Sequence, residues 1–411
     1  DLELIPISAD KLNWIFNYGS TRPVGYTSGP NLVNRNLTWE TATTTNVGMD
    51  LSFLNNRLSA TVDWFERRTI DMVGPSQAMP GVLGTSVPKE NNSTLRTRGW
   101  EISLNWKHAL ENGLSYNLGI SLYDYKSVVT KYFNPTGTLS TWYEGAEVGD
   151  IWGYTVNDLF RSQEDLDSYL SKVDMTHIAA NWNTGDLKYE DINHDGKVNN
   201  GTNTIGNHGD LSVIGNDQPH YQYTINGGVS YKGFDFSMLW RGVAKKDMYF
   251  YRGSNIYWGF MGGWWESCLT PEHLDYFRDQ PGSKYSGLYE GDANINTDAY
   301  WPRPYLNNTE EAKNKNHANT RYLQNAAYLR LQNVQLGYSF PRSITSKMHL
   351  EKLRIYFSGE NLLTFSKLPS GIDPVAPVGF PTGGEFFGTA GSGRLTYGAD
   401  RIYSIGLTVT Y

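Results

Sequence analysis

The chain has 411 residues, of which 42 are acidic and 35 are basic, so its formal net charge is −7. Because the basic residues are scattered along an acidic chain, the composition argues against a nucleic-acid-binding protein. The sequence contains no run of about eighteen apolar residues, so it predicts no membrane-spanning helix.

Nine segments alternate apolar and polar residues with a period of two, as strands with one apolar face do. In the last of them, Tyr403, Ile405 and Leu407 share one face, and small or polar residues occupy the other. Eight of the segments form pairs joined by short turns, and the turn Lys232–Gly233 suits a tight hairpin. In chain order the segments are 47–53, 58–64, 100–106, 116–122, 221–231, 234–240, 334–340, 353–357 and 403–411.

Soluble antiparallel sandwiches also alternate in this way, because they bury one face of each sheet. Three features favour a membrane barrel instead. The apolar faces of these segments carry no ionisable residue, as expected where a lipid-facing charge costs about 2–4 kcal/mol at mid-bilayer. Tryptophan and tyrosine lie near segment ends, as in the aromatic girdles of barrels. Long connections at 65–99, 124–220, 242–327 and 360–401 contrast with the short turns, an asymmetry typical of outer-membrane barrels. The ionisable residues lie on the polar faces, at Asp50, Asp63, Glu101, Lys107, Asp235 and Arg241.

Several runs of residues resemble one protein family. The run Leu37–Thr41, followed by Asn46–Asp50 and Phe53–Leu58, resembles a hairpin of the SusC/RagA-type TonB-dependent outer-membrane transporters. Further matches follow in the order of that family and span nearly the whole chain. They are Thr97–Glu101, Glu147–Tyr154, Gly185–Lys197, Val213–Asn216, Tyr328–Tyr338, Glu360–Phe365, Gly371–Pro374 and Tyr403–Leu407.

The resemblance implies an all-β fold, a transmembrane antiparallel β-barrel with long extracellular loops. Residues 1–411 would form the C-terminal part of a single barrel, roughly half of a plugged barrel of about 22 strands. The plug domain and the early strands would precede Asp1, so the chain is expected to be a fragment. Its two open sheet edges would need a partner piece to close them.

The resemblance also implies a function, TonB-energised import of oligosaccharides or peptides across the outer membrane of a Gram-negative, Bacteroidota-like bacterium. A SusD-like surface lipoprotein would act as the lid. The TonB complex would be reached through the missing N-terminal part, and the apolar face would contact the lipid bilayer. Nucleic acid is not an expected partner.

The run Asp191, Asn193, Asp195, Lys197 and Asn199 has the oxygen-ligand spacing of the first nine positions of an EF-hand-like calcium loop. Lys197 would contribute its main-chain carbonyl, and the glycine at 196 permits the sharp turn. Position twelve is a threonine, so Asp210 or Asp217 would have to complete the shell. The alternative is a turn held by its own side-chain hydrogen bonds. A bound Ca²⁺ would brace the loop and take no part in chemistry.

A dense aromatic segment offers the substrate-binding candidates. Aromatic faces that stack on sugar rings, with polar groups interspersed, make a glycan contact surface. The segment could instead pack on itself, extend the interfacial belt, or seal against the lid. Trp142, Tyr143 and Trp152 leave the same alternatives open. The candidates in the segment are Tyr251, Tyr257, Trp258, Trp264 and Trp265.

Enzymatic function is not expected. The sequence lacks G-x-S-x-G, H-E-x-x-H and a phosphate-binding glycine loop, and its eight histidines show no metal-ligand spacing. Two other classes stay open. One is a soluble, calcium-stabilised, β-rich carbohydrate-binding module or glycosidase, and the other is a passive porin.

Overall fold

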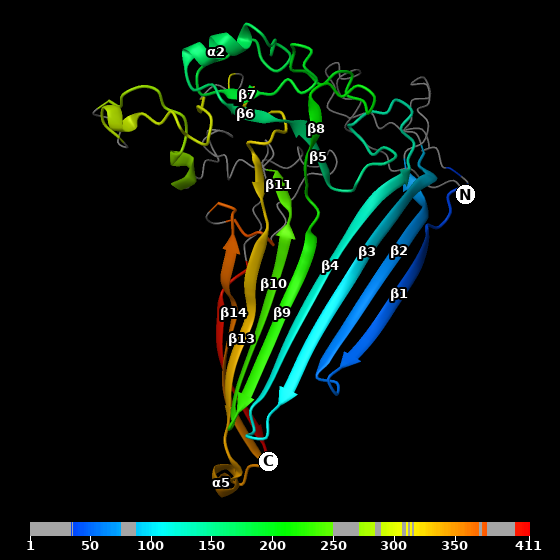
Figure 1. Ribbon diagram of the computed structural model, residues 1–411, viewed down its shortest axis with the longest axis vertical. Coiled ribbons are helices and arrows are strands. Elements are labelled where there is room, and N and C mark those ends of the chain that lie inside the picture. The colour runs from blue at the N-terminus through cyan, green and yellow to red at the C-terminus, as the bar shows by residue number, and fades with distance from the viewer. Residues whose placement is uncertain are drawn as a thin grey trace, which may run out of the picture.

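The computed structural model describes residues 34, 36–74, 88–249, 271–283, 289–305, 310, 313–314, 316–369, 372–375 and 399–411. These residues form two parts, a long antiparallel sheet and a smaller body of loops, short strands and short helices at one end of it (Figure 1). We call the smaller body, which comprises the described parts of 132–219 and 246–327, the cap. None of the helices in the described ranges has the length and the apolar content needed to cross a membrane.

Nine antiparallel strands make the large sheet, in the order β1-β2-β3-β4-β9-β10-β13-β14-β15. Each of the nine alternating segments predicted from the sequence corresponds to one of these strands, so the period-two pattern is confirmed as strand. Within the described residues, β1 and β15 pair on one side only. The strands are β1 (Thr41–Phe53), β2 (Leu58–Gly74), β3 (Glu90–Ala109), β4 (Ser115–Lys131), β9 (His220–Tyr231), β10 (Phe234–Lys245), β13 (Tyr328–Ser339), β14 (Lys352–Ser366) and β15 (Ile402–Thr410).

The short turns lie together at one end of the sheet, which we call the turn end, and the cap lies at the other, the loop end (Figure 1). Lys232 and Gly233 have φ values of 48° and 90°. Both are positive, as a two-residue hairpin turn of the I′ type requires. The predicted tight hairpin between β9 and β10 is therefore confirmed. The turn between β13 and β14 holds the short helices α5 (Arg342–Thr345) and η4 (Ser346–Met348).

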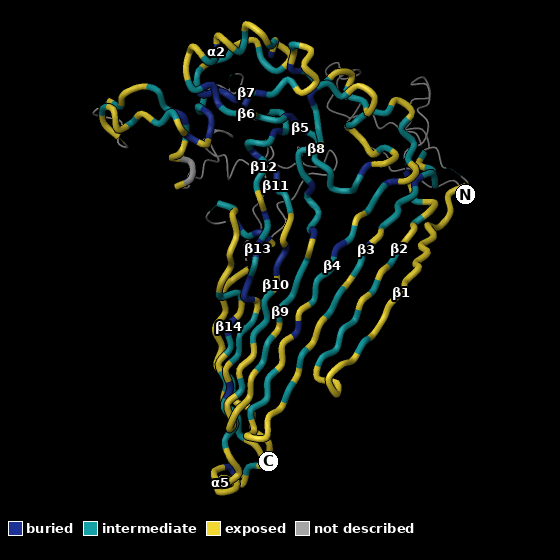
Figure 2. Tube along the Cα trace, in the orientation of Figure 1, coloured by how far each residue is buried: buried dark blue, intermediate teal, exposed yellow. Residues whose placement is uncertain are grey.

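The apolar face of the sheet is exposed along its length. Cross-strand register places Val47 opposite Trp64, and Trp64 opposite Trp100. Val47 is 65% exposed, Ile405 78% and Leu407 63%. Figure 2 shows exposed and intermediate residues along most of the sheet, whereas buried stretches gather toward the cap. These apolar side chains are therefore not packed into a compact protein interior.

The connection predicted at 65–99 is much shorter than expected. Strands β2 and β3 continue toward the loop end as far as Gly74 and Glu90, so most of this range is paired strand. The apolar pattern ends at Trp64 and Trp100, and charged residues take its place on the same face. Glu66 lies opposite Arg98 and forms an ion pair with it. Cross-strand pairs of opposite charge stabilise this part of the strands. Because its residues are polar, the alternation of apolar and polar residues does not predict it.

The described part of the cap includes three two-stranded ribbons and the helix α2. The ribbons pair β5 (Asp150–Tyr154) with β8 (Leu211–Asn216), β6 (Val156–Leu159) with β7 (Leu187–Tyr189), and β11 (Asp247–Tyr249) with β12 (Leu323–Asn325). Helix α2 (Gln163–Leu170) begins after Ser162, whose hydroxyl accepts the Asp165 N–H at 3.2 Å. This is a serine N-cap. The cap also contains the short 3-10 helices η2 (Pro271–Leu274) and η3 (Asp292–Asn294).

Candidate functional site

The polar face of the sheet carries side chains that hydrogen-bond across neighbouring strands. The hydroxyls of Ser115 and Ser230 lie 2.6 Å apart, and the Tyr123 hydroxyl donates to Gln222 Oε1 at 2.7 Å. Polar cross-strand pairs of this kind stabilise a sheet. A face built from them suits the water-filled interior of a barrel.

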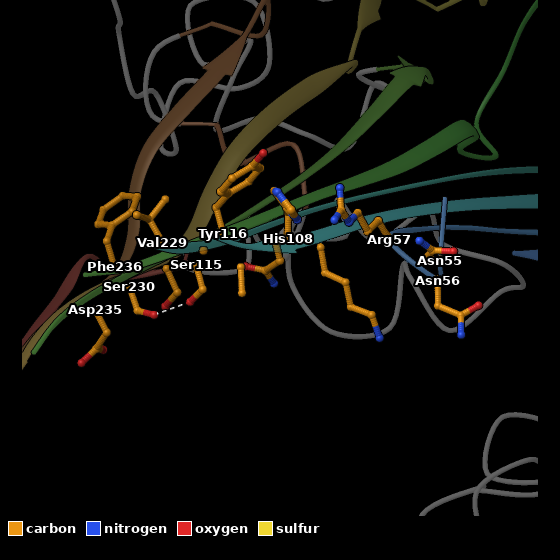
Figure 3. Close-up of a pocket in the computed structure, with 15 residues that line it drawn as sticks. Asn55, Asn56, Arg57, His108, Ser115, Tyr116, Val229, Ser230, Asp235 and Phe236 are labelled. Atoms are coloured by element: carbon orange, nitrogen blue, oxygen red, sulfur yellow. Dashed lines mark hydrogen bonds between the residues drawn. The ribbon is translucent and has the colours of Figure 1, made fainter. Parts of the chain in front are cut away.

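Figure 3 shows both faces of the strands near the turn end. Ser115, Ser230 and Asp235 point to one side of the sheet, while Tyr116 and Phe236 point to the other. All five residues line a hollow of about 640 Å³ at this end. The strict alternation inferred from the sequence is thus visible in the side chains themselves.

An ion pair on the polar face explains the glycine in the run Tyr328–Tyr338, one of the runs that resemble the transporter family. Arg354 Nε donates to Asp235 Oδ2 at 3.0 Å, and Arg354 Nη2 donates to Gln335 Oε1 at 3.0 Å. A Cβ atom at Gly337 would collide with the Arg354 guanidinium and the Asp235 carboxylate. The glycine between Leu336 and Tyr338 is therefore required so that this charged pair can lie flat against the strand.

The cap has an apolar core of its own, built from segments far apart in the sequence. Phe160 and Leu187 are fully buried in it, together with Phe277 and Tyr322 from the later connection. The two longest connections between hairpins, which the sequence analysis treated as separate loops, therefore fold against each other. Burial in this core raises the pKa of Tyr169 to about 12, so its hydroxyl remains a neutral donor to the Tyr189 carbonyl.

A buried ion pair ties the same two segments together. Lys313 Nζ lies 2.7 Å from Asp186 Oδ2, and both side chains are essentially inaccessible to solvent. The other Asp186 oxygen accepts hydrogen bonds from the Tyr305 hydroxyl at 2.8 Å and from Asn314 Nδ2 at 3.0 Å. Because a buried charge is tolerated only when it is paired and hydrogen-bonded, this arrangement fixes how the segments meet.

A second polar cluster joins the cap to the sheet. His220 Nδ1 lies 2.7 Å from Asp124 Oδ1, and His220 Nε2 lies 3.6 Å from Glu147 Oε1. Lys126 Nζ binds Glu147 Oε2 at 3.0 Å. These residues line a hollow of about 360 Å³ between β4, β9 and the β5/β8 ribbon. The sequence alone did not reveal this cluster, although Asp124 interrupts the apolar series at 118, 120 and 122.

Asp150 belongs to the same hollow. Burial raises the pKa of Asp150, and the hydrogen bond from Asn216 Nδ2 at 3.0 Å partly offsets this. The backbone N–H of Asn216 donates in turn to Asp247 Oδ2 at 3.0 Å. Backbone and side chain of Asn216 thus bridge two acidic groups, which explains why an asparagine ends β8.

The predicted calcium loop is compact. Asp191 Oδ2 accepts the Gly196 N–H at 2.9 Å, and Asp195 Oδ1 accepts the Lys197 N–H at 2.9 Å. The backbone at 196 has a φ of +82°, which a glycine adopts without strain. Asn193 Oδ1 accepts the Asp195 N–H at 3.0 Å. The oxygen-bearing side chains at alternate positions therefore accept hydrogen bonds from backbone N–H groups of the same segment and hold it in a turn.

Asp210 folds back onto this loop, as the sequence analysis required for a completed shell. Its Oδ1 accepts the Ile192 N–H at 2.8 Å, and its Oδ2 accepts the Asn199 N–H at 2.8 Å. Across the described ranges, no three or more His, Cys, Asp or Glu side chains are grouped so that they could hold a metal ion. The geometry accounts for the loop as a hydrogen-bonded turn, and the bound calcium stays a prediction.

The five substrate-binding candidates, Tyr251, Tyr257, Trp258, Trp264 and Trp265, lie outside the described residues. The other aromatic candidates are described. Trp152 Nε1 donates to the Tyr143 hydroxyl at 3.1 Å, and the two rings meet edge to face. Trp142 is 41% exposed, and its ring centroid lies 5.8 Å from that of Tyr132.

An open hollow of about 310 Å³ lies beside these rings in the cap. Tyr132 and Tyr143 form part of its wall, and Asn134 and Glu144 provide polar groups. Aromatic walls with a few polar groups are typical of small ligand sites. Of the residues considered in the sequence analysis, Tyr143 lines this hollow, whereas Trp152 packs behind it.

Together, the alternating sheet and its cap define a class of protein, the strand-built membrane barrel with long loops on one side. No family model matches the chain. It is 24% identical over 362 residues to the TonB-dependent receptor P3 of Formosa agariphila, an alignment that covers 84% of this chain and 31% of the receptor. It is 23% identical over 367 residues to the TonB-dependent receptor SusC of Bacteroides thetaiotaomicron, covering 86% of this chain and 31% of SusC.

Solved structures agree on the fold. The chain superimposes on the RagAB peptide transporter with a TM-score of 0.62 and 19% identity, covering 99% of this chain and 38% of the other. A second structure, of the RagAB peptide importer in an open-open state, gives a TM-score of 0.62 at 18% identity. The resemblance to SusC/RagA-type TonB-dependent transporters, and the fold of a C-terminal barrel portion, are thereby confirmed.

The chain spans about a third of the length of the curated relatives it matches. These curated relatives are named receptors, and the solved structures are named a transporter and an importer, in agreement with the expectation that this chain is not an enzyme. What the whole protein transports, and with which partners, is a separate question.

Proposed function

We propose that this chain is the C-terminal barrel portion of a transporter that imports nutrients across the outer membrane of a Gram-negative, Bacteroidota-like bacterium. The observation that carries the proposal is the division of the sheet into two faces. Large apolar side chains such as Ile405, Leu407 and Leu336 are exposed on one face, whereas the other is lined by hydrogen-bonded polar pairs. Lipid on one side and a watery interior on the other satisfy both faces.

The open edges support the same proposal. Strands β1 and β15 each lack a second neighbour in the described part of the chain. Unpaired edges invite aggregation unless further strands cover them. Earlier strands of the same polypeptide, with a plug inside the closed barrel, would supply this cover.

Energisation and the lid follow from the relatives and are part of the proposal. The curated relatives are named TonB-dependent receptors, so the complete protein is proposed to draw energy from TonB through its plug. A SusD-like surface lipoprotein is proposed to close over the cap.

The proposed cargo is an oligosaccharide or a peptide. The aromatic hollow beside Trp142 supports an oligosaccharide, because exposed aromatic faces stack on sugar rings. The fold shared with a peptide transporter supports a peptide. Loop 191–199 is proposed to take Ca²⁺ as a brace for the cap, with Asp210 closing the site.

The test uses the complete protein in cells of a Gram-negative host, with fluorescent oligosaccharides and peptides of matched length. Uptake should require the protein, should stop when the proton gradient is collapsed, and should stop in a strain without TonB. Uptake that survives both treatments would favour a passive porin. Recovery of the complete protein in the soluble fraction would favour the carbohydrate-binding module or glycosidase.

A further inference from the structure

The apolar face of the sheet becomes charged at one level near the loop end. On β2 the outward series runs from Val62 through Trp64 to Glu66 and Arg68, since residues two apart share a face. The register places Arg98 opposite Glu66 and Arg96 opposite Arg68. The charged rows thus begin directly beyond the aromatic row, about 7 Å further along the strands.

Strand β4 continues these rows. Lys126 lies opposite Arg98, and Asp124 lies opposite Trp100. Strands β2, β3, β4 and β9 form a hollow of about 430 Å³ here, whose lining includes Trp64, Trp100, Tyr221, the cations of Arg96, Arg98 and Lys126, and the carboxylate of Asp124. It has an aromatic floor and a cationic rim, and it opens on the apolar side of the sheet.

The cations of this rim are only partly neutralised. Glu66 is 13% exposed and pairs with both Arg68 and Arg98, which stand 60% and 51% exposed above it. Lys126 pairs with Glu147 and is 62% exposed. Among the described residues, no side chain pairs with Arg96. Four cations, Arg68, Arg96, Arg98 and Lys126, therefore face three carboxylates, Glu66, Glu147 and Asp124, of which Asp124 also pairs with His220.

Phosphate is the chemistry that this arrangement suits. Guanidinium groups bind phosphate oxygens with parallel hydrogen bonds, and an exposed lysine adds a point charge. Basic pockets on the lipid-facing side of membrane proteins recognise phosphorylated headgroups. The aromatic rings below lie where indole and phenol groups sit among headgroups and upper acyl chains.

We propose that this hollow binds the phosphorylated headgroup of an outer-leaflet glycolipid. The acyl chains of the lipid would lie along the apolar rows below Trp64 and Trp100, while Arg96, Arg98 and Lys126 hold the phosphate. The inference rests on the proposed function, because it requires the sheet to stand in an outer membrane.

The experiment measures lipid binding to the complete protein, purified in detergent, by native mass spectrometry with bisphosphorylated lipid A. The double variant Arg96→Gln, Lys126→Gln should bind it roughly thirtyfold more weakly, since each cation near an anionic surface contributes about 1 kcal/mol. Arg96→Lys, which keeps the charge, should retain most of the wild-type affinity. Arg67→Gln, on the opposite face of β2, is the matched control and should bind like the wild type.

Two further arms separate the possible sources of the signal. Dephosphorylated lipid A should bind wild type and double variant equally weakly, and millimolar inorganic phosphate should not displace the intact lipid. Glu147→Gln frees Lys126 from its carboxylate, so it should bind lipid A at least as well as the wild type. A loss of binding in Glu147→Gln as large as in the double variant would show that the cluster acts structurally, and would overturn the proposal.

Failure of the inference is distinguishable from failure of the proposed function. If the complete wild-type protein fractionates with the outer membrane but binds lipid A no better than the double variant does, the lipid site is wrong and the transporter stands. If free phosphate displaces the lipid, the site is an anion site without lipid specificity, and the proposal is again overturned. A protein absent from the membrane fraction would refute the proposed function itself.

Discussion

A single charge placed on the lipid-facing side of β4 gives the most direct test of the two-faced sheet. Ile120 lies opposite Leu104 on β3 and Ile225 on β9, so it sits within the apolar rows, and it is 41% exposed. Arginine on a lipid-facing barrel position costs about 2–4 kcal/mol near the bilayer midplane. Ile120→Arg should therefore shift the folding equilibrium of the complete protein by roughly 30- to 700-fold.

The matched control is Ser237→Arg, because Ser237 is exposed on the polar face of β10. An arginine there would point into water, and its effect should remain within about 0.5 kcal/mol. Both variants of the complete protein would be folded into lipid vesicles and unfolded with urea, with gel mobility of unheated samples reporting the folded fraction. Equal destabilisation by the two arginines, or a larger effect at Ser237, would refute the assignment of the faces.

Three other expectations concern the cap and the connection that follows β14. Trp142→Ala should weaken cargo binding to the complete receptor about fivefold, since an aromatic contact contributes roughly 1 kcal/mol beyond its area. Unchanged affinity would remove the aromatic hollow from the cargo path. Calcium should raise the melting temperature of the complete protein, and Asp191→Asn combined with Asp195→Asn should abolish that response, whereas a wild type insensitive to calcium and chelator would leave only the hydrogen-bonded turn. Burial acts to raise the pKa of Asp373, but backbone amides and Arg330, at 2.6 Å, outweigh it and hold that pKa below its ordinary value. The stability gained from this lowered pKa is present at neutral pH and is lost as the pH falls through the folded-state value. Urea midpoints from pH 6 to pH 3 should therefore decline less in Asp373→Asn than in the wild type, and equal slopes would contradict the assignment.

The strands of the sheet could be predicted from the sequence because each of them has apolar residues at every second position, all on one face. The nine segments found by alternation correspond to the nine strands, and the turn at Lys232–Gly233 followed from its residue types. The residues at which the strands begin and end could not be predicted. Beyond Trp64 the outward positions are Glu66 and Arg68, and alternation says nothing about strands whose two faces are both polar.

The fold of the cap could not be predicted from the sequence either, for a different reason. Its core joins Phe160 and Leu187 to Phe277 and Tyr322, more than a hundred residues away in some pairs. The apolar residues of these loops do not recur at a regular spacing, so the sequence does not predict that they pack together. Contacts between residues so far apart in the sequence depend on the whole fold. The Asp124–His220 pair left a weak local signal, an acidic residue at an apolar-face position. Only the fold reveals the partner 96 residues later.

The sheet and the cap are stabilised by different means, and this has a consequence for how they respond to change. The sheet relies on cross-strand pairing and on lipid for its apolar face, whereas the cap buries its own apolar core. The described ion pairs that join them are those of Glu147 in the cap with Lys126 on β4 and with His220 on β9. Polar interfaces between bodies with separate cores permit relative motion more readily than large apolar ones do. Substitutions on the lipid face and in the cap core should therefore contribute additively to stability, since they share no partner. Substitutions at these two ion pairs are the ones that would couple the cap to the barrel beneath it.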